Sequence, residues 1–315
     1  MNSKYILIPD NLTSYEFYNA ILPMISEVGE SGNDIVLDFS HIKNIDSLVI
    51  PNLLCLGQIW KNKYSRPIII YIPDTYYSGK VKKYLFDIGF TEYAEYYGLF
   101  DFIGEIWGGL AKDSIDPICK TIYFSAKQSD DDIIRTVELN VKPFAEKYIS
   151  DFESIRECED GFFYSNDIVD FLTELVINSK IHAKSISFAT LAAKYSTKKI
   201  CLAVSDCGEG FSSTIGKEMK ANSEEEAIML GIYKRDQSKV YGLYNIIKQI
   251  IECGGKVRIH SNDTQMIFTQ KVMGSFLEKR LNCDEFRKYN IRESVLFEGV
   301  HVELEIPFER RQFRW

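Results

Sequence analysis

Through the first hundred residues, apolar segments of strand length alternate with amphipathic segments of helix length, and this alternation restricts the fold most. The strand patterns lie at 5–8, 34–39 and 67–72, and the helix patterns lie at 14–28, 49–60 and 81–88. Strands that alternate with helices of this length form a sheet layered with helices. The N-terminal third of the chain is therefore predicted to be an α/β domain.

One segment of this third carries a recognisable motif. In DIVLDFSHIKNIDSLVIPNLL, a strand ends in Asp-x-Ser and an Asp-Ser pair opens a helix. The segment resembles the STAS domain of anti-sigma-factor antagonists, over about the first third of the chain. The resemblance implies that Ser47, which follows Asp46, is a phosphoacceptor, although Leu48 and Val49 replace the usual Ser-Gly or Thr-Gly. The alternative is that Asp46 or Ser47 only caps the helix by accepting a backbone N–H.

The periodic pattern weakens between residues 101 and 120, where glycine and proline interrupt it. We therefore predict an N-terminal domain at 1–100, a connecting segment at 101–120 and a second domain at 121–308. Residues 309–315 are expected to form a C-terminal tail.

A helix predicted from Asn166 to Ala183 carries three polar residues at four-residue intervals. Glu174, Asn178 and His182 therefore project from one face. A carboxylate and a carboxamide one turn apart can orient a water and a hydrated Mg²⁺, which keeps most of its water ligands. Polar residues at this spacing also form ordinary solvated helix faces, so this motif needs support from others.

That support comes from two segments further along the chain. A buried strand at 200–204 leads to Asp206, and Gly208 and Gly210 follow at alternate positions, where the missing side chains let a planar ligand approach the backbone. A helix then begins after Gly242, and its first N–H groups suit a phosphate. Taken alone, the first segment is equally compatible with a glycine-rich turn.

Four segments in this order, ELVINSKIHA, DCGEGF, YGLYNIIKQIIECGGKVRIHS and FEGVHVELEIP, together resemble the GHKL ATPases. This family includes gyrase, Hsp90-type chaperones, histidine kinases and MutL. The resemblance covers roughly residues 120–308. It implies an α/β (α+β) sandwich, with a mixed sheet covered by helices on one face, that binds ATP and Mg²⁺.

The resemblance also assigns roles by position. It implies that Glu174 is the base that activates water and that Asn178 coordinates Mg²⁺. Asp206 would accept the adenine amino group, with Gly208 and Gly210 shaping the pocket for the base.

The remaining assignments concern the phosphates. Gly242 and Leu243 fall where the family's lid meets the phosphate-binding helix. His182 matches a position that is often basic and could contact a phosphate, although an ordinary surface histidine is the alternative. Ser238 and Val240 replace glycines of the lid, so nucleotide binding is expected more firmly than efficient turnover. The presumed lid, 212–238, also holds candidate phosphate-binding cations: Lys217, Lys220, Lys234 and Arg235.

These motifs predict an ATP-binding regulatory protein that resembles a fused anti-sigma-factor kinase and STAS antagonist, with nucleotide state controlling partner binding. Two alternatives stay open: an ATP-hydrolysing conformational switch of the Hsp90 or MutL type without kinase activity, and a nucleotide-independent scaffold. Enzymatic activity is left open between an ATPase and a serine protein kinase. Ile106, Trp107 and Leu110 predict a packed connection, and hence a fixed interface with Ser47 unphosphorylated.

Composition excludes several other classes. A net charge of −8 argues against nucleic-acid partners and against anionic membranes. No stretch approaches the ~20 apolar residues that span a bilayer, and the first residues show no secretory pattern, so a cytoplasmic location is expected. The seven cysteines form no C-x-x-C pair, which argues against a zinc knuckle or a disulfide framework. Expected partners are ATP or ADP and a regulatory protein, and a homodimer is left open.

Overall fold

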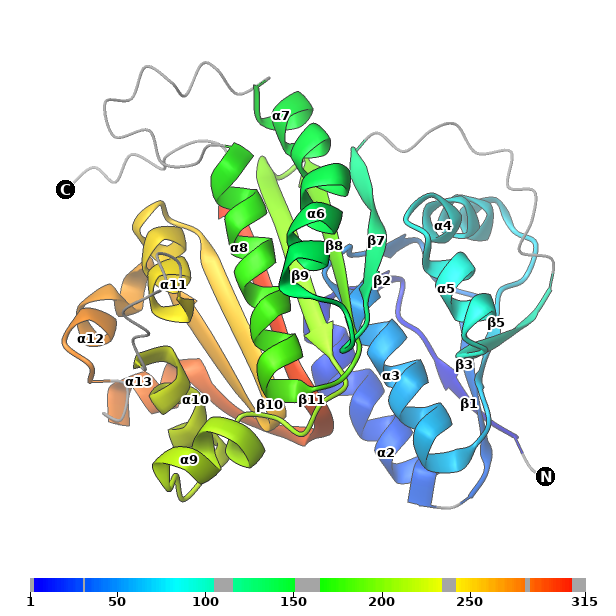
Figure 1. The fold of residues 1–315 in the computed structure, drawn as a ribbon. Coiled ribbons are helices and arrows are strands. Elements are labelled where there is room, and N and C mark those ends of the chain that lie inside the picture. The colour runs from blue at the N-terminus through cyan, green and yellow to red at the C-terminus, as the bar shows by residue number, and fades with distance from the viewer. Residues whose placement is uncertain are drawn as a thin grey trace.

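The chain forms two units, each built on its own β-sheet (Figure 1). The computed structural model describes residues 3–30, 32–104, 116–150, 165–233, 242–280 and 284–307. We call residues 3–104 the N-terminal unit and residues 116–307 the C-terminal unit. Parallel and antiparallel sheets occur together with helices, so the predicted mixed α/β (α+β) class is confirmed at this level.

The N-terminal unit contains a sheet of four parallel strands, in the order β1 (Ser3–Leu7), β3 (Asp34–Asp38), β5 (Ile68–Tyr71) and β6 (Phe100–Ile103). The connections between them form the helices α1 (Ser14–Glu16), η1 (Phe17–Ile21), α2 (Leu22–Glu30), α3 (Val49–Tyr64), α4 (Tyr76–Asp87) and α5 (Phe90–Tyr96). Two short strands, β2 (Asn11–Leu12) and β4 (Asn44–Ile45), pair beside this sheet. The predicted alternation of strands and helices is confirmed. Strand β6 extends the first sheet into the segment that was predicted to be a connection.

Helix α3 is buried on nearly every side over its first nine residues. It packs against β5 of its own sheet and against β8, β9 and β11 of the C-terminal unit. A helix that is apolar all round must be enclosed on all sides, and here two sheets enclose it. Helix α3 is therefore shared by the two units.

The C-terminal unit is built on a five-stranded sheet, in the order β10 (Lys256–Thr269), β11 (Ile291–Pro307), β9 (Lys199–Asp206), β8 (Ser187–Lys194) and β7 (Ile118–Phe124). Every neighbouring pair in this sheet is antiparallel. The prediction of a mixed sheet for this unit is therefore wrong. A parallel pair needs a long crossover connection, whereas β8 and β9 are joined by a four-residue turn.

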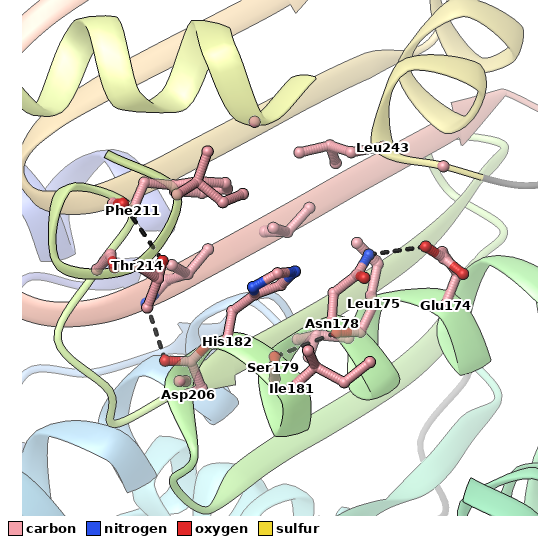
Figure 2. Close-up of a pocket in the computed structure, with 18 residues that line it drawn as sticks. Glu174, Leu175, Asn178, Ser179, Ile181, His182, Asp206, Phe211, Thr214 and Leu243 are labelled. Carbon is pink, nitrogen blue, oxygen red and sulfur yellow. Dashed lines mark hydrogen bonds between the residues drawn. The ribbon is translucent and has the colours of Figure 1, made fainter. Parts of the chain in front are cut away.

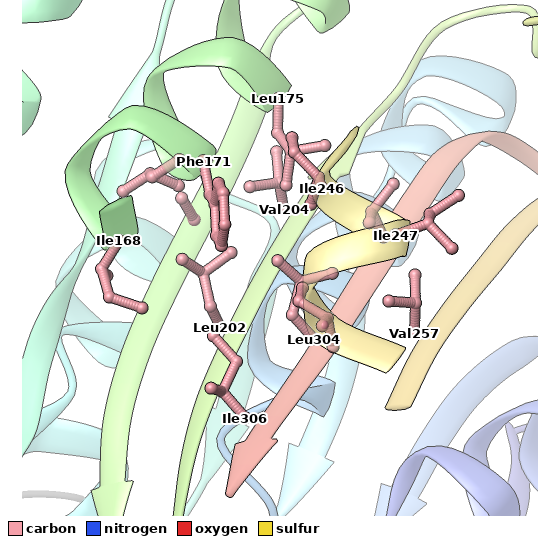
Figure 3. Close-up of a cluster of buried hydrophobic side chains, with 14 of the residues drawn as sticks. Ile168, Phe171, Leu175, Leu202, Val204, Ile246, Ile247, Val257, Leu304 and Ile306 are labelled. Atoms are coloured by element: carbon pink, nitrogen blue, oxygen red, sulfur yellow. The ribbon is translucent and has the colours of Figure 1, made fainter. Parts of the chain in front are cut away.

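One face of this sheet is covered by the unit's own helices α6 (Asp130–Asn140), α7 (Lys142–Ser150), α8 (Ser165–Asn178) and α11 (Leu243–Glu252). Figure 3 shows how apolar side chains from α8, α11 and three strands meet there, among them Phe171, Leu202 and Ile246. The remaining helices are η3 (Ser179–Ala183), η4 (Ser212–Gly216), α9 (Lys217–Met219), α10 (Glu224–Tyr233), η5 (Gln270–Val272), α12 (Met273–Leu277) and α13 (Asp284–Asn290). Helices α6 and α7 follow each other directly, because α6 ends at Asn140 and α7 begins at Lys142.

The other face of the sheet is covered by η1, α2 and α3 of the N-terminal unit, and Tyr93 of α5 contacts Phe188 of β8, so the two units have a continuous core. Phe188 of β8 and Phe297 of β11 belong to the hydrophobic cluster of the N-terminal unit. Tyr18 of η1 stacks on His260 of β10, with 4.5 Å between the ring centroids. Burial lowers the pKa of both His260 and His301, so these two histidines are neutral in the folded chain.

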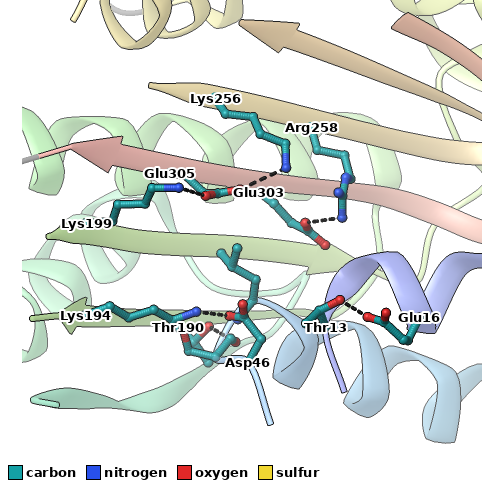
Figure 4. A network of polar contacts seen from close by, with 12 residues as sticks. Thr13, Glu16, Asp46, Thr190, Lys194, Lys199, Lys256, Arg258, Glu303 and Glu305 are labelled. Carbon is teal, nitrogen blue, oxygen red and sulfur yellow. Dashed lines mark hydrogen bonds and ion pairs between the residues drawn. The ribbon is translucent and has the colours of Figure 1, made fainter. Parts of the chain in front are cut away.

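A network of buried polar side chains lies at this interface and includes bonds between the two units. Asn52 of α3 donates to Glu303 Oε1 at 3.0 Å and accepts a hydrogen bond from Ser205 at 2.6 Å. The second Glu303 oxygen contacts Arg258 at 3.0 Å, and these two side chains are only 4% and 8% exposed (Figure 4). Burial raises the pKa of Glu303, and the Arg258 guanidinium opposes that shift. Buried charges need such partners, and the network therefore fixes how the units pack.

Within the described ranges, no helix combines the length and the apolar character needed to cross a bilayer. The cysteines there are free thiols, at 55, 119, 201, 207 and 253. The predicted C-terminal tail, together with Ile106, Trp107 and Leu110 of the connecting segment, lies outside the described residues.

Candidate functional site

A pocket of about 250 Å³ lies between the sheet of the C-terminal unit and the helices α8, α10 and α11 (Figure 2). Asp206, Phe211 and Thr214 lie at one end, and Glu174, Asn178 and Leu243 lie at the other. The walls between the two ends are largely apolar. An elongated, mostly apolar pocket with polar groups at both ends is typical of small-molecule sites.

Helix α8 supplies the polar floor of the pocket. Its opposite face is apolar, and Ile168, Leu172 and Val176 on that face are buried. After Asn178 the helix widens into the π-turn η3, a departure that is frequent at functional sites. His182 lines the pocket from this turn and is half-buried.

Glu174 and Asn178 contact each other directly. The Asn178 Nδ2 donates to Glu174 Oε1 at 2.9 Å, as one helical turn between them allows. This bond orients the carboxamide, and both side chains line the pocket. The predicted pairing of a carboxylate with a carboxamide is therefore present in the structure.

Asp206 is the last residue of β9, and it is 1% exposed. Its Oδ1 accepts backbone hydrogen bonds from Gly208 at 2.9 Å and from Val300 at 3.1 Å. Burial raises the pKa of Asp206 to about 6, and these two hydrogen bonds, with one from the Ser179 side chain, oppose the shift. A carboxylate with one oxygen held by the backbone and its charge barely solvated is well suited to accept a hydrogen bond from a ligand.

Glycines are required around Asp206 because other segments approach closely. A Cβ at Gly208 would overlap Ala183, and one at Gly299, where φ is +103°, would overlap the Asp206 carbonyl oxygen. Gly210 has φ of +82° and packs against Asn262. Of the two glycines predicted to shape the pocket, Gly210 lines it. Gly208 does not line it, but its backbone N–H donates a hydrogen bond to Asp206.

The far end of the pocket is formed by the start of α11. Gly242 is the N-cap residue, and the helix begins at Leu243, as predicted. Both residues line the pocket. Gly231 of α10 lines it as well. Lys234, Arg235, Ser238 and Val240 lie outside the described residues.

The other predicted residues lie elsewhere. Lys217 and Lys220 are exposed and do not line the pocket.

The Asp46–Ser47 motif lies outside the pocket as well. Ser47 is 1% exposed, just before α3, and its carbonyl oxygen accepts a hydrogen bond from Thr190 of β8 at 3.0 Å. Asp46 accepts from the Leu48 backbone N–H at 3.0 Å and pairs with Lys194 at 2.6 Å. Asp46 therefore accepts a backbone N–H in the turn before α3, but the N-cap residue is Leu48 and no side chain caps the helix, so the capping alternative is not confirmed.

Several residues at the site are not among those predicted from the sequence. Ser179 lines the pocket, where its hydroxyl lies 3.1 Å from the Leu175 carbonyl oxygen and also within reach of Asp206. Thr214 lies in the π-turn η4 beside Asp206 and hydrogen-bonds within that turn. Gly299 is required by its backbone geometry. Among these three residues, only Gly299 has a signal in the sequence. It is the glycine of the segment FEGVHVELEIP, and glycine is the residue that most readily adopts a positive φ.

The donor atoms at the Glu174 end suit a hard cation. A carboxylate and a carboxamide oxygen are ligands that Mg²⁺ accepts, and Mg²⁺ usually takes only one or two such groups from a protein. The residues that the structure describes contain no cluster of three His, Cys, Asp or Glu side chains that could hold a metal alone. The Asn178 carboxamide oxygen could therefore be one ligand of a magnesium ion, with water and a bound molecule supplying the others.

Comparisons of the chain with protein-family models, with curated proteins and with solved structures gave no match.

Proposed function

We propose that this chain is an ATP-binding regulatory protein, and that the pocket of the C-terminal unit binds the adenine nucleotide. One observation carries this proposal. Three segments, around Glu174, Asp206 and Gly242, converge on one pocket with a buried carboxylate at one end and a helix N-terminus at the other. This is the arrangement that the resemblance to the GHKL ATPases implies.

The two ends of the pocket suit different parts of a nucleotide. At one end, Asp206 would accept a hydrogen bond from the exocyclic amino group of adenine, and Phe211 and Ile215 would pack on the base. At the other end, the N-terminus of α11, which begins at Leu243, would bind phosphate oxygens. Asn178 would hold Mg²⁺, which neutralises phosphate charge when it is bound. Glu174 would accept a proton from an attacking water or hydroxyl group.

The Asp206→Asn variant is expected to bind ATP and adenosine about 5- to 100-fold more weakly than the wild type. The amide keeps an oxygen for Gly208 and Val300 but faces the adenine amine with a donor, and a poorly paired buried group costs ~1–3 kcal/mol. Isothermal titration calorimetry with both ligands measures this. The control is Asp263→Asn, which alters an exposed carboxylate on β10.

The pH dependence gives a second measurement on the same pair of proteins. Because the pKa of Asp206 is raised to about 6, its carboxylate is charged above that pH and protonated below it. The affinity advantage of the wild type over Asp206→Asn should therefore be full above pH 7 and shrink as the pH falls through 6. Equal affinities of the two folded proteins at pH 8 would show that the base is not bound at Asp206.

The regulatory part of the proposal depends on how the N-terminal unit contacts the sheet. Alternate residues of β9 point to opposite faces. Asp206 faces the pocket, whereas Ser205 contacts Asn52 and the Cys207 thiol contacts the Cys55 carbonyl at 3.9 Å. The strand that carries the base-binding carboxylate thus also contacts α3. Nucleotide state would reach the N-terminal unit, and through it a protein partner, by this contact.

The burial of Ser47 favours a conformational switch over an internal kinase. Ser47 lies beneath β8 on the face of the sheet opposite the pocket, so a bound nucleotide would not reach it in this arrangement. Incubation with Mg-ATP is expected to leave the intact mass of the protein unchanged. A single added phosphate that disappears in Ser47→Ala would instead support the kinase and STAS-antagonist alternative.

A further inference from the structure

Glu224, the first residue of α10, is a buried carboxylate that does not line the pocket. It is 8% exposed. Its oxygens accept hydrogen bonds from the backbone N–H groups of Phe211 at 2.8 Å and Ser212 at 3.2 Å. It also accepts from the Ser261 hydroxyl and, at 3.0 Å, from Asn262 Nδ2. Four donors from two separate segments therefore converge on one carboxylate.

These donors belong to the turn that forms the wall beside Asp206. Gly210, Phe211 and Thr214 all line the pocket, and the π-turn η4 begins at Ser212. Asn262 also donates to the Glu209 carbonyl at 3.0 Å, and the Ser261 hydroxyl accepts from the Phe211 N–H at 3.1 Å. Hydrogen bonds to Glu224 and to side chains of β10 therefore fix the position of this turn.

Helix α10 contacts the same turn again near its other end. A Cβ at Gly231 would lie 2.6 Å from the Phe211 ring, so the ring packs directly on the helix backbone. Gly231 itself lines the pocket. The position of the Phe211 ring therefore depends on α10 at both ends, through Glu224 at the first turn and through Gly231 two turns later.

We propose that Glu224 is a positioning residue for the nucleoside end of the pocket. By accepting hydrogen bonds from Phe211 and Ser212, it fixes the turn that places the Phe211 ring and the Gly210 backbone against the base. This inference rests on the proposed function, because it assigns the Asp206 end of the pocket to the nucleoside.

The Glu224→Gln variant is expected to bind adenosine and ATP about tenfold more weakly than the wild type. An amide of the same size presents one acceptor oxygen and one NH₂ group, so the NH₂ must face at least one of the donors that the carboxylate now accepts from. The loss should be the same for adenosine and ATP, because the phosphates bind at the other end of the pocket. Calorimetric titration with each ligand measures both affinities.

A second readout needs no ligand. In the free protein, hydrogen exchange of a peptide that covers residues 209–216 should be faster in Glu224→Gln than in the wild type. Exchange within 225–233 should change little, which separates loss of the turn from unfolding of α10. If Glu224→Gln does not fold, Ser261→Ala removes one hydrogen bond to the same turn without altering α10 and should raise exchange at the same peptide.

The matched control is Glu226→Gln. Glu226 lies in the same helical turn, and its carboxylate accepts from the Asn222 backbone N–H at 2.7 Å and from the Asn222 side chain at 2.9 Å, away from the pocket. It should match the wild type in both measurements. Unchanged exchange at 209–216, or unchanged adenosine affinity, in a folded Glu224→Gln protein would overturn the inference. If the wild type bound neither adenosine nor ATP, the proposed function would fail, and the exchange data alone would report whether Glu224 holds the turn.

Discussion

ATP turnover by the Glu174→Gln variant is expected to fall by ~10²–10⁴-fold while its affinity for ATP stays that of the wild type. The reason is that a positioned general base accelerates proton transfer by this factor, and the glutamine amide cannot accept the proton. Its oxygen can still accept the hydrogen bond from Asn178, so the geometry of the floor is preserved. Phosphate release under single-turnover conditions measures the effect.

Two further variants sharpen this test. Asn178→Ala should weaken ATP binding in the presence of Mg²⁺ and leave Mg²⁺-free binding unchanged, because the asparagine is assigned to the cation. Glu138→Gln, which changes an exposed carboxylate on α6, should match the wild type in every assay. Equal turnover by wild type and Glu174→Gln would remove the catalytic role. Undetectable turnover by both would favour a slow switch or a scaffold.

Arg258→Met is expected to destabilise the whole chain by about 3–5 kcal/mol. The substitution leaves Glu303 buried between the two units without its cation, and one hydrogen bond from Asn52 does not replace that charge. Urea unfolding at pH 7, followed by circular dichroism, gives the change in the free energy of unfolding.

The double variant Arg258→Met with Glu303→Gln provides the control for that measurement. Glutamine removes the unpaired charge but keeps an oxygen that accepts from Asn52, so most of the lost stability should return. If Arg258→Met alone cost less than about 1 kcal/mol, in the range of surface ion pairs, the pair would not be a buried structural element.

Elements with a strong periodic pattern were predictable from the sequence. The helix at 166–183 and the helix that starts at Leu243 have apolar stripes and polar motifs, and both are confirmed. Strand β8 is not among the predicted elements, because SFATLAAK lacks alternation and is rich in alanine, a weak strand former. Its residues are buried on both faces, by α8 on one side and α3 on the other, so tertiary packing decides its structure.

The candidate site was predictable only as far as local motifs extend. Glu174, Asn178 and Asp206 stand in short patterns whose spacing is informative, and they line one pocket. Glu224 has no such pattern, because an acidic residue in the first turn of a helix is ordinary. Its partners Ser261 and Asn262 lie 37 and 38 residues further along the chain. The strand order of the second sheet likewise depends on pairings between distant segments, such as β9 with β11, although β8 and β9 are joined by a short turn.

The burial of α3 between two sheets has a consequence for how this chain is synthesised. Asn52 and its partner Glu303 are 251 residues apart in the sequence. At ribosomal rates of ~5–20 residues per second, α3 waits roughly 10 to 50 s before β11, which completes its second wall, has been made. Until then its apolar outer face is covered at most by β8 and β9, and the part that packs against β11 stays exposed. Strand β11 therefore completes the wall that encloses α3, and a chain that stops before β11 is expected to expose this face of α3 to chaperones and proteases.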